Sequence, residues 1–102
     1  MSPRHPGVSA APNRCEIKLR VVSVTCSERF PDKQELVFEL LAARPIEGPD
    51  FATQRIGQSV NGFTFDTSVT LTAGVLANAE AEYLGGARQG SFQLSNLKAS
   101  TP

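Results

Sequence analysis

The stretch CEIKLRVVSVTC, Cys15–Cys26, decides the fold. From Cys15 to Val21 apolar residues alternate with charged ones, the pattern of a strand with one buried face. At Val21–Val22 the alternation slips by one residue, and the apolar set continues on the other parity. Such a slip moves every later side chain to the opposite face, so we predict a β-bulge or sharp bend here. A long first strand that bends in this way indicates a small, strongly curled sheet.

The same stretch holds both cysteines of the chain. Eleven residues of extended chain separate Cys15 from Cys26 by roughly 35 Å, far beyond the limit of about 7 Å for a disulfide. Two cysteines are also too few for a structural zinc site. We therefore predict two free thiols, each a buried apolar residue at one end of the strand.

Length and composition indicate one ordinary globular domain. The chain has 102 residues, of which 40% are hydrophobic, and ten basic side chains balance ten acidic ones. We expect residues 1–14, rich in proline and without periodicity, to be a disordered tail, 15–98 to be the domain, and 99–102 to be frayed. No apolar run is long enough for a membrane span and the first residues lack a signal-peptide core, so we expect a cytoplasmic protein and no membrane partner.

Two segments follow the first strand. RFPDKQ, residues 29–34, predicts a hairpin turn, because Pro31 presets φ and Asp32 is a common turn residue. Residues 34–44, QELVFELLAAR, suit either a strand or a helix, since their apolar residues fit both periods. We favour a strand paired with the first one, ended by Arg44–Pro45, and we expect a loop over residues 45–54.

The dipeptide Asn61–Gly62 predicts a type I′ hairpin turn. The strand before it spans about residues 54–60, and the strand after it spans 63–72. In the second strand one set of side chains is expected to point inward: Phe63, Phe65, Val69 and Leu71. The alternating set is expected to face outward: Thr64, Asp66, Ser68, Thr70 and Thr72.

Residues 74–84, GVLANAEAEYL, predict a short helix, because they are rich in alanine, their apolar positions recur at helical spacing and Gly85–Gly86 follows. A last strand over residues 91–98 supplies Phe92 and Leu94 to the core. The expected order is β-β-β-β-α-β. The fold class is mainly β with one short helix, a small curled sheet that is either barrel-like (OB-like) or two-layered.

Residues for catalysis are not grouped in this sequence. The one histidine, His5, lies in the predicted tail, so neither a Ser-His-Asp nor a Cys-His site can be assembled. GGARQG, residues 85–90, has the glycines of a phosphate-binding loop but not its spacing or lysine. We expect no enzyme activity, no cofactor and no metal site.

Candidate contact residues are few. Base stacking on an OB-like barrel needs exposed aromatic rings near Lys or Arg. Phe30 and Phe51, in loops and with Arg29 and Arg55 close in sequence, are the candidate platforms. Part of the outward face expected on residues 63–72 could instead contact a protein: Thr64, Asp66 and Thr70.

The order of segments resembles small accessory proteins of tailed phages. The matching segments are CEIKLRVVSVTCSE, KQELVFELLAA, VTLTAG, the Ala- and Asn-containing stretch after it, and the final strand. The final strand of that group is rich in aromatic residues, whereas the corresponding segment here, SFQLSNLK, has a single one. The resemblance implies a non-enzymatic accessory protein, located in the host cytoplasm or the virion.

Two functions follow. The favoured one is a non-enzymatic interaction or structural accessory module that acts through self-association or a protein partner, since a neutral chain with edge strands suits such contacts. The alternative is an OB-like binder of single-stranded nucleic acid or a small nucleotide. A balanced charge lowers the expectation of phosphate binding without removing it.

Overall fold

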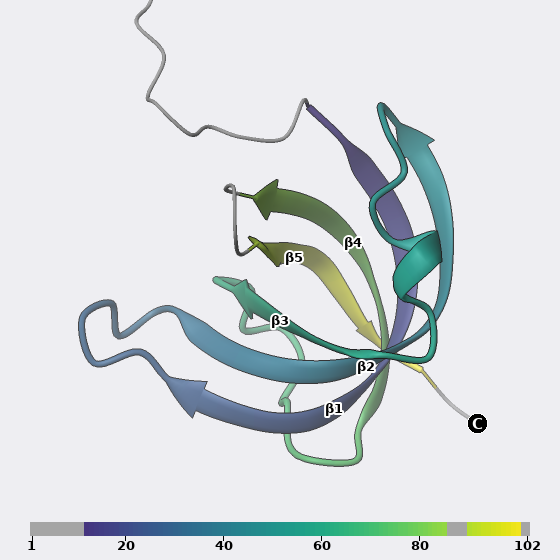
Figure 1. Ribbon diagram of the computed structural model, residues 1–102. Coiled ribbons are helices and arrows are strands. Elements are labelled where there is room, and N and C mark those ends of the chain that lie inside the picture. The colour runs from purple at the N-terminus through teal and green to yellow at the C-terminus, as the bar shows by residue number, and fades with distance from the viewer. Residues whose placement is uncertain (1–11, 86–89, 101–102) are drawn as a thin grey trace, which may run out of the picture.

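The computed structural model describes residues 12–85 and 90–100. Within this part of the chain five strands form a closed barrel in the order β1-β2-β3-β5-β4, and β4 pairs back on β1 (Figure 1). The elements are β1 (Arg14–Cys26), β2 (Gln34–Glu47), the 3₁₀ turn η1 (Thr53–Arg55), β3 (Ser59–Thr64), β4 (Leu76–Gly85) and β5 (Gly90–Ala99). Neighbouring strands are antiparallel except β3 and β5. The barrel, rather than the two-layer alternative, is thus confirmed, and it is OB-like.

The predicted bulge in β1 is confirmed. Val21 pairs with Phe38 of β2 and Ser23 pairs with Val37, so Val22 is the extra residue. Before the bulge β1 pairs with both β2 and β4, whereas beyond it β2 is the strand that pairs with it. The bulge therefore lies where β1 leaves the barrel wall.

The ambiguous segment after the first turn is a strand, as favoured, but Pro45 does not end it. β2 continues to Glu47, and Pro45 pairs with Cys15 next to an irregularity that leaves Ile46 unmatched. Over this stretch β2 pairs with β1, while β3 pairs only with Gln34–Glu39. Proline is tolerated there because Pro45 lies beside an irregularity and on a part of β2 with which β3 does not pair. The N–H group that proline lacks is therefore not needed for a ladder hydrogen bond to β3.

The predicted hairpin turn at Asn61–Gly62 is wrong. Both residues lie inside β3, where Asn61 pairs with Val37 and Gly62 pairs with Leu36 on one side and Phe92 on the other. A Cβ on Gly62 would lie 2.6 Å from the Phe38 ring and 2.9 Å from the Phe92 carbonyl oxygen. This glycine therefore serves a close approach inside the barrel rather than a turn.

The strand predicted over residues 63–72 is also wrong. β3 ends at Thr64, and residues 65–75 form an irregular connection. The two faces are inverted at this point, because Thr64 is fully buried and Phe65 is 50% exposed. The Thr64 hydroxyl donates to the carbonyl oxygen of Leu94 at 2.8 Å and accepts from the N–H of Asp66 at 2.9 Å, so its burial leaves no unpaired polar group.

The predicted helix over residues 74–84 is a strand. Ala77, Ala79 and Ala81 of β4 are buried, and the residues between them face outward. β4 closes the barrel by pairing with β1 and β5, and these ladders outweigh the helical preference of alanine. The expected β-β-β-β-α-β order is therefore corrected to five strands, with η1 between β2 and β3. Because there is no helix at this point, the glycines that begin GGARQG do not end one. Residues 86–89 of that motif lie outside the described part.

The last strand is confirmed, with Phe92 and Leu94 in the core. The largest fully buried side chains come from β1, β2, β3 and β5: Phe38, Phe92, Leu19, Leu40, Leu94, Val21 and Thr64. Each large apolar side chain buried here stabilises the fold by about 1.5–3 kcal/mol. The small alanines of β4 face these bulky residues, an alternation that suits a narrow barrel.

Both predicted ends partly join the fold. Residues 1–11 of the expected tail and residues 101–102 lie outside the described part, whereas β1 begins at Arg14 and β5 includes Ala99. The Asn13 side-chain amide donates to the Tyr83 carbonyl oxygen at 3.1 Å, and its oxygen accepts from the Tyr83 N–H at 2.8 Å. Asn13 thus extends the ladder between β1 and β4.

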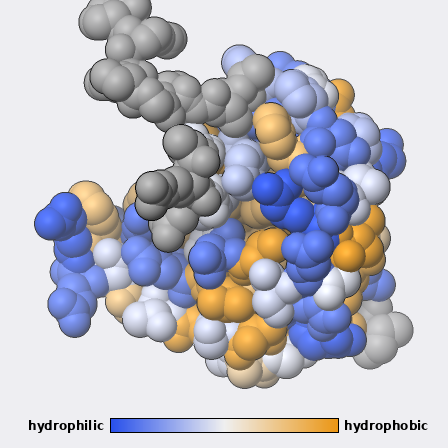
Figure 2. Space-filling model, viewed as in Figure 1, coloured by the Kyte–Doolittle hydropathy of each residue, from blue (hydrophilic) through white to orange (hydrophobic). Residues whose placement is uncertain are grey.

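The ends of β1 and β2 project from the barrel as a hairpin, at left in Figure 1. We call residues 22–37 the arm. Its tip is a tight turn, in which the Ser27 N–H bonds the Lys33 carbonyl and the Lys33 N–H bonds the Phe30 carbonyl. Figure 2 shows the arm standing out from the surface, with hydrophilic residues beside apolar ones toward its tip.

Candidate functional site

The outer face of the arm and β3 carries a shallow groove. The strand register places Thr25, Glu35, Phe63 and Gln93 in one row across β1, β2, β3 and β5. Six of the residues that line the groove are Ser23, Thr25, Lys33, Asn61, Phe63 and Ser91. In OB-like barrels the face of strands 2 and 3, with the loop between strands 1 and 2, is the surface that binds ligands.

Two residues that line this groove, Lys33 and Phe63, belong to a cluster with two further aromatic side chains. The Lys33 ammonium nitrogen lies 4.6 Å from the centre of the Phe63 ring and 5.7 Å from that of Phe30. The rings of Phe63 and Phe65 meet edge to face, with centroids 6.0 Å apart. Phe30 and Phe65 are each 50% exposed. We call these four residues the aromatic cluster.

Hydrogen bonds hold Phe30 in place. Phe30 sits at the arm tip, where its N–H bonds the Ser27 hydroxyl at 3.1 Å and its carbonyl accepts from Lys33. The tip therefore presents the ring from an ordered turn rather than from a loose loop.

Phe65 is fixed from the opposite side, just beyond β3. The next residue, Asp66, accepts the N–H of Ser68 at 2.8 Å and that of Leu97 at 2.9 Å, which ties the chain to β5. The hydrogen bond with the Ser68 hydroxyl makes the largest contribution to holding the pKa of Asp66 below its usual 3.8, and the two N–H groups make smaller ones. An ionised Asp66 thus anchors the segment that presents Phe65.

The predicted contact residues are divided among several places. Phe30 belongs to the aromatic cluster, and Arg29 is exposed beside it at the arm tip. Thr70 is exposed in the connection over residues 65–75, whereas Thr64 is buried and Asp66 has the anchoring role described above.

Phe51 and Arg55 lie in a second group. The Phe51 ring stacks on Tyr83 at 5.0 Å, and the Arg55 guanidinium lies 4.8 Å from the Tyr83 ring centre. Arg55 also donates to the Phe51 carbonyl. Phe51 is half-buried, with one face against Tyr83. This group secures the connection between β2 and β3.

Three members of the aromatic cluster were missed by sequence reasoning: Lys33, Phe63 and Phe65. Both phenylalanines were assigned to the core because they alternate with polar residues. The available signal was Asp66-Thr67-Ser68, a run of turn-forming residues that argues against a strand continuing past Thr64.

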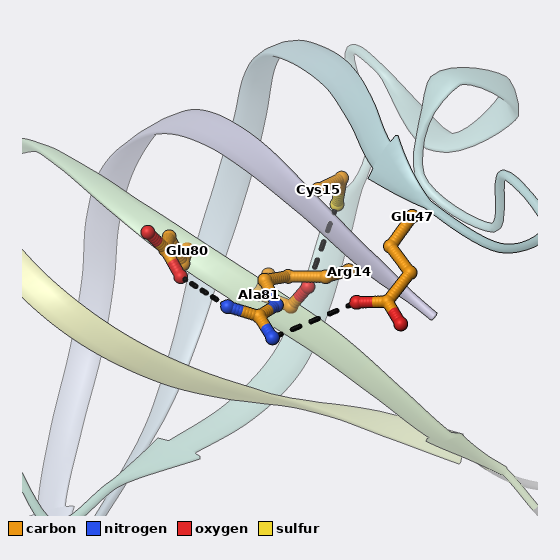
Figure 3. Close-up of polar contacts among 5 residues, drawn as sticks. All are labelled: Arg14, Cys15, Glu47, Glu80 and Ala81. Carbon is orange, nitrogen blue, oxygen red and sulfur yellow. Dashed lines mark hydrogen bonds and ion pairs between the residues drawn. The ribbon is translucent and has the colours of Figure 1, made fainter. Parts of the chain in front are cut away.

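Arg14 makes two ion pairs at one end of the barrel. Figure 3 shows Arg14 of β1 reaching Glu47 of β2 at 3.6 Å and Glu80 of β4 at 3.2 Å. Arg14 thus bridges the two neighbours of β1 at the barrel end. The side chains are substantially exposed, so each pair contributes at most about 1 kcal/mol. Their arrangement suits stability rather than substrate binding.

The two thiols are free, but only one is buried as predicted. The Cys15 thiol donates weakly to the Ala81 carbonyl at 3.7 Å, also drawn in Figure 3. Burial, followed by the nearby charge of Asp50, raises the pKa of Cys15 to about 11, so this thiol is inert at neutral pH. Cys26 is exposed on the arm, because the arm lies beyond the barrel interior.

Among residues 12–85 and 90–100, no group of three or more His, Cys, Asp or Glu side chains is placed to hold a metal ion. Over the same residues, no helix has the length and apolar character needed to cross a membrane. No family model, curated protein or solved structure matches the chain.

Proposed function

We propose that this protein binds single-stranded nucleic acid on the outer face of the arm and β3. The observation that carries the proposal is the aromatic cluster, in which the rings of Phe30 and Phe63 lie near the Lys33 ammonium group and the Phe65 ring packs against that of Phe63. Exposed phenylalanine faces offer platforms on which bases stack, and every base has a face that can use them. The position of the cluster, with Phe30 and Lys33 in the turn between β1 and β2 and Phe63 on β3, supports the same use.

The charges near the cluster predict that stacking outweighs phosphate binding. Arg29 and Lys33 are the basic residues of the arm, and Lys33 also lies 3.7 Å from the Glu35 carboxylate. Each phosphate neutralised on a single strand changes the logarithmic salt slope by about −0.7. One or two contacts therefore weaken binding only about 3- to 7-fold between roughly 50 and 200 mM salt.

Fluorescence anisotropy tests the proposal directly. The probe is a labelled oligothymidylate of about 12 nucleotides, within the site sizes common for such barrels. Because stacking on one ring contributes about 1–3 kcal/mol per base, Phe65→Ala and Phe30→Ala should each raise Kd about 5- to 150-fold.

The matched control is Ile56→Ala. Ile56 is 42% exposed and lies after η1, outside the aromatic cluster and the groove. This variant should bind as the unmodified protein does. No binding at about 50 mM salt, where the phosphate contribution is strongest, would remove the proposal. Equal loss in Ile56→Ala and Phe65→Ala would show that the rings are not the platform.

A second candidate function is the interaction module favoured by the sequence, acting through self-association or a protein partner. The observation in its favour is the side of β1 that faces away from β2 on the arm, where no strand among the described residues pairs with it. The phage resemblance and a cytoplasmic location belong to this candidate, and a gene neighbourhood of virion genes would support it. Size-exclusion chromatography with light scattering tests it, because a strict monomer that captures no protein would refute it.

A further inference from the structure

The outer edge of β1 changes character at the bulge. From Cys15 to Arg20 this edge is covered by β4, and Val21 bonds the backbone of Val75 and Gly74. Over Val22–Cys26 the described residues place β2 on one side of β1 and no strand on the other. On the opposite side of the arm, β3 covers Gln34–Glu39 of β2. The arm is thus the end of a sheet with one open edge, five residues long.

The open edge lacks the charged and proline residues that often block strand pairing, and the bulge at Val22 lies at its first position. Its sequence is VSVTC, with no charge, no proline and three β-branched residues, and Val22 is 46% exposed. Monomeric proteins commonly protect such an edge with lysine, proline or a covering segment. An unprotected edge with high β propensity is a surface for strand addition.

We propose that a second copy of this chain pairs with this edge, antiparallel and about a two-fold axis at Val24. Directly opposed residues of an antiparallel pair point to the same face of the sheet. A two-fold axis perpendicular to the sheet must therefore pass midway between one residue and the same residue of the second copy. The axis at Val24 uses all five free residues. It sets Val22 opposite Cys26 of the second copy and Ser23 opposite Thr25 of the second copy.

The neighbouring registers fit less well. An axis at Ser23 would require pairing at Arg20 and Val21, whose edge is already bonded to β4 and the segment before it. An axis at Thr25 would require Ser27 and Glu28, which lie beyond the end of β1.

This dimer is a specific form of the self-association candidate and does not depend on nucleic-acid binding. The arms of the two copies would form one continuous sheet. Because the axis is perpendicular to that sheet, both aromatic clusters would lie on the same side of it. The dimer would therefore offer two equivalent binding surfaces to a ligand long enough to reach both.

Disulfide formation tests the register. In a Cys26→Ser background, Val24→Cys should form an interchain disulfide under mild oxidation, because the two residues at position 24 face each other within bridging distance. Thr25→Cys and Ser23→Cys in the same background are the matched controls. Each lies diagonally from its own copy, about 7–8 Å away, and should cross-link far less. The unmodified chain should not cross-link, because its two Cys26 residues would lie about 13 Å apart.

Light scattering on the reduced, unmodified protein separates the possible failures. We expect the mass to rise from monomer toward dimer as concentration increases. A monomer at every concentration overturns both the inference and the self-association candidate. A dimer in which cysteines at positions 23, 24 and 25 cross-link equally, or not at all, overturns the register and leaves self-association standing. Loss of oligonucleotide binding would bear on neither.

Discussion

Gly62→Ala should destabilise the protein by overfilling the barrel. The added methyl would lie 2.6 Å from Cε1 of Phe38 and 2.9 Å from the backbone oxygen of Phe92, closer than carbon atoms are normally found. A backbone oxygen cannot rotate away, so β5 must shift at the point where it pairs with β3. Overpacking of this kind costs about 1–3 kcal/mol. In a domain of about 100 residues, this corresponds to a fall in Tm of about 4–24 °C.

Equilibrium unfolding in urea, followed by circular dichroism, measures the effect. The companion variant is Asn61→Thr, at the exposed neighbouring position of β3. In a strand, a β-branched residue there is neutral or slightly stabilising. In a type I′ turn, where both central residues need positive φ, the same substitution is costly. Gly62→Ala unfolding at the unmodified midpoint, together with a destabilised Asn61→Thr, would refute the close-approach explanation and restore the turn.

The remaining predictions concern polar and thiol groups. Asp66→Asn should lower the free energy of unfolding above about pH 4, because the folded-state pKa of Asp66 lies below its usual 3.8. The difference in unfolding free energy between the variant and the unmodified protein should shrink as the pH falls through that lowered pKa. A difference that does not depend on pH would contradict this prediction. Thr64→Val should cost about 1–3 kcal/mol in urea unfolding, since it removes the hydroxyl that bonds the Leu94 carbonyl oxygen and the part-buried Asp66 N–H, whereas a neutral result would mean that these hydrogen bonds are replaced. A thiol reagent at neutral pH should titrate Cys26 in the native protein and Cys15 only after unfolding, and two fast thiols would show that the barrel end is open.

Sequence reasoning succeeded where a local pattern and its tertiary role agreed. The alternation in Cys15–Cys26, its slip at Val22 and the last strand all follow from period-two burial, which neighbouring strands reinforce. The curled sheet was predictable for the same reason, because a long bent strand in a short chain must curl. Phe30 was found because it lies in a turn, where an aromatic residue has no strand face to enter.

Tertiary structure decided the places where local preference pointed elsewhere. Gly62 follows Asn61, the best hairpin signal available, yet the Phe38 ring needs the space that a glycine leaves. The alanines of β4 favour a helix locally, but their small size is what a strand facing bulky core residues requires. Thr64 faces the interior and Phe65 faces solvent, the reverse of the expected orientation. Inside the barrel the Thr64 hydroxyl donates a hydrogen bond to the Leu94 carbonyl oxygen, which makes its burial possible. The pairing of strands across the barrel depends on residues far apart in the sequence. Both the closure of the barrel and the exposure of the aromatic cluster depend on this pairing.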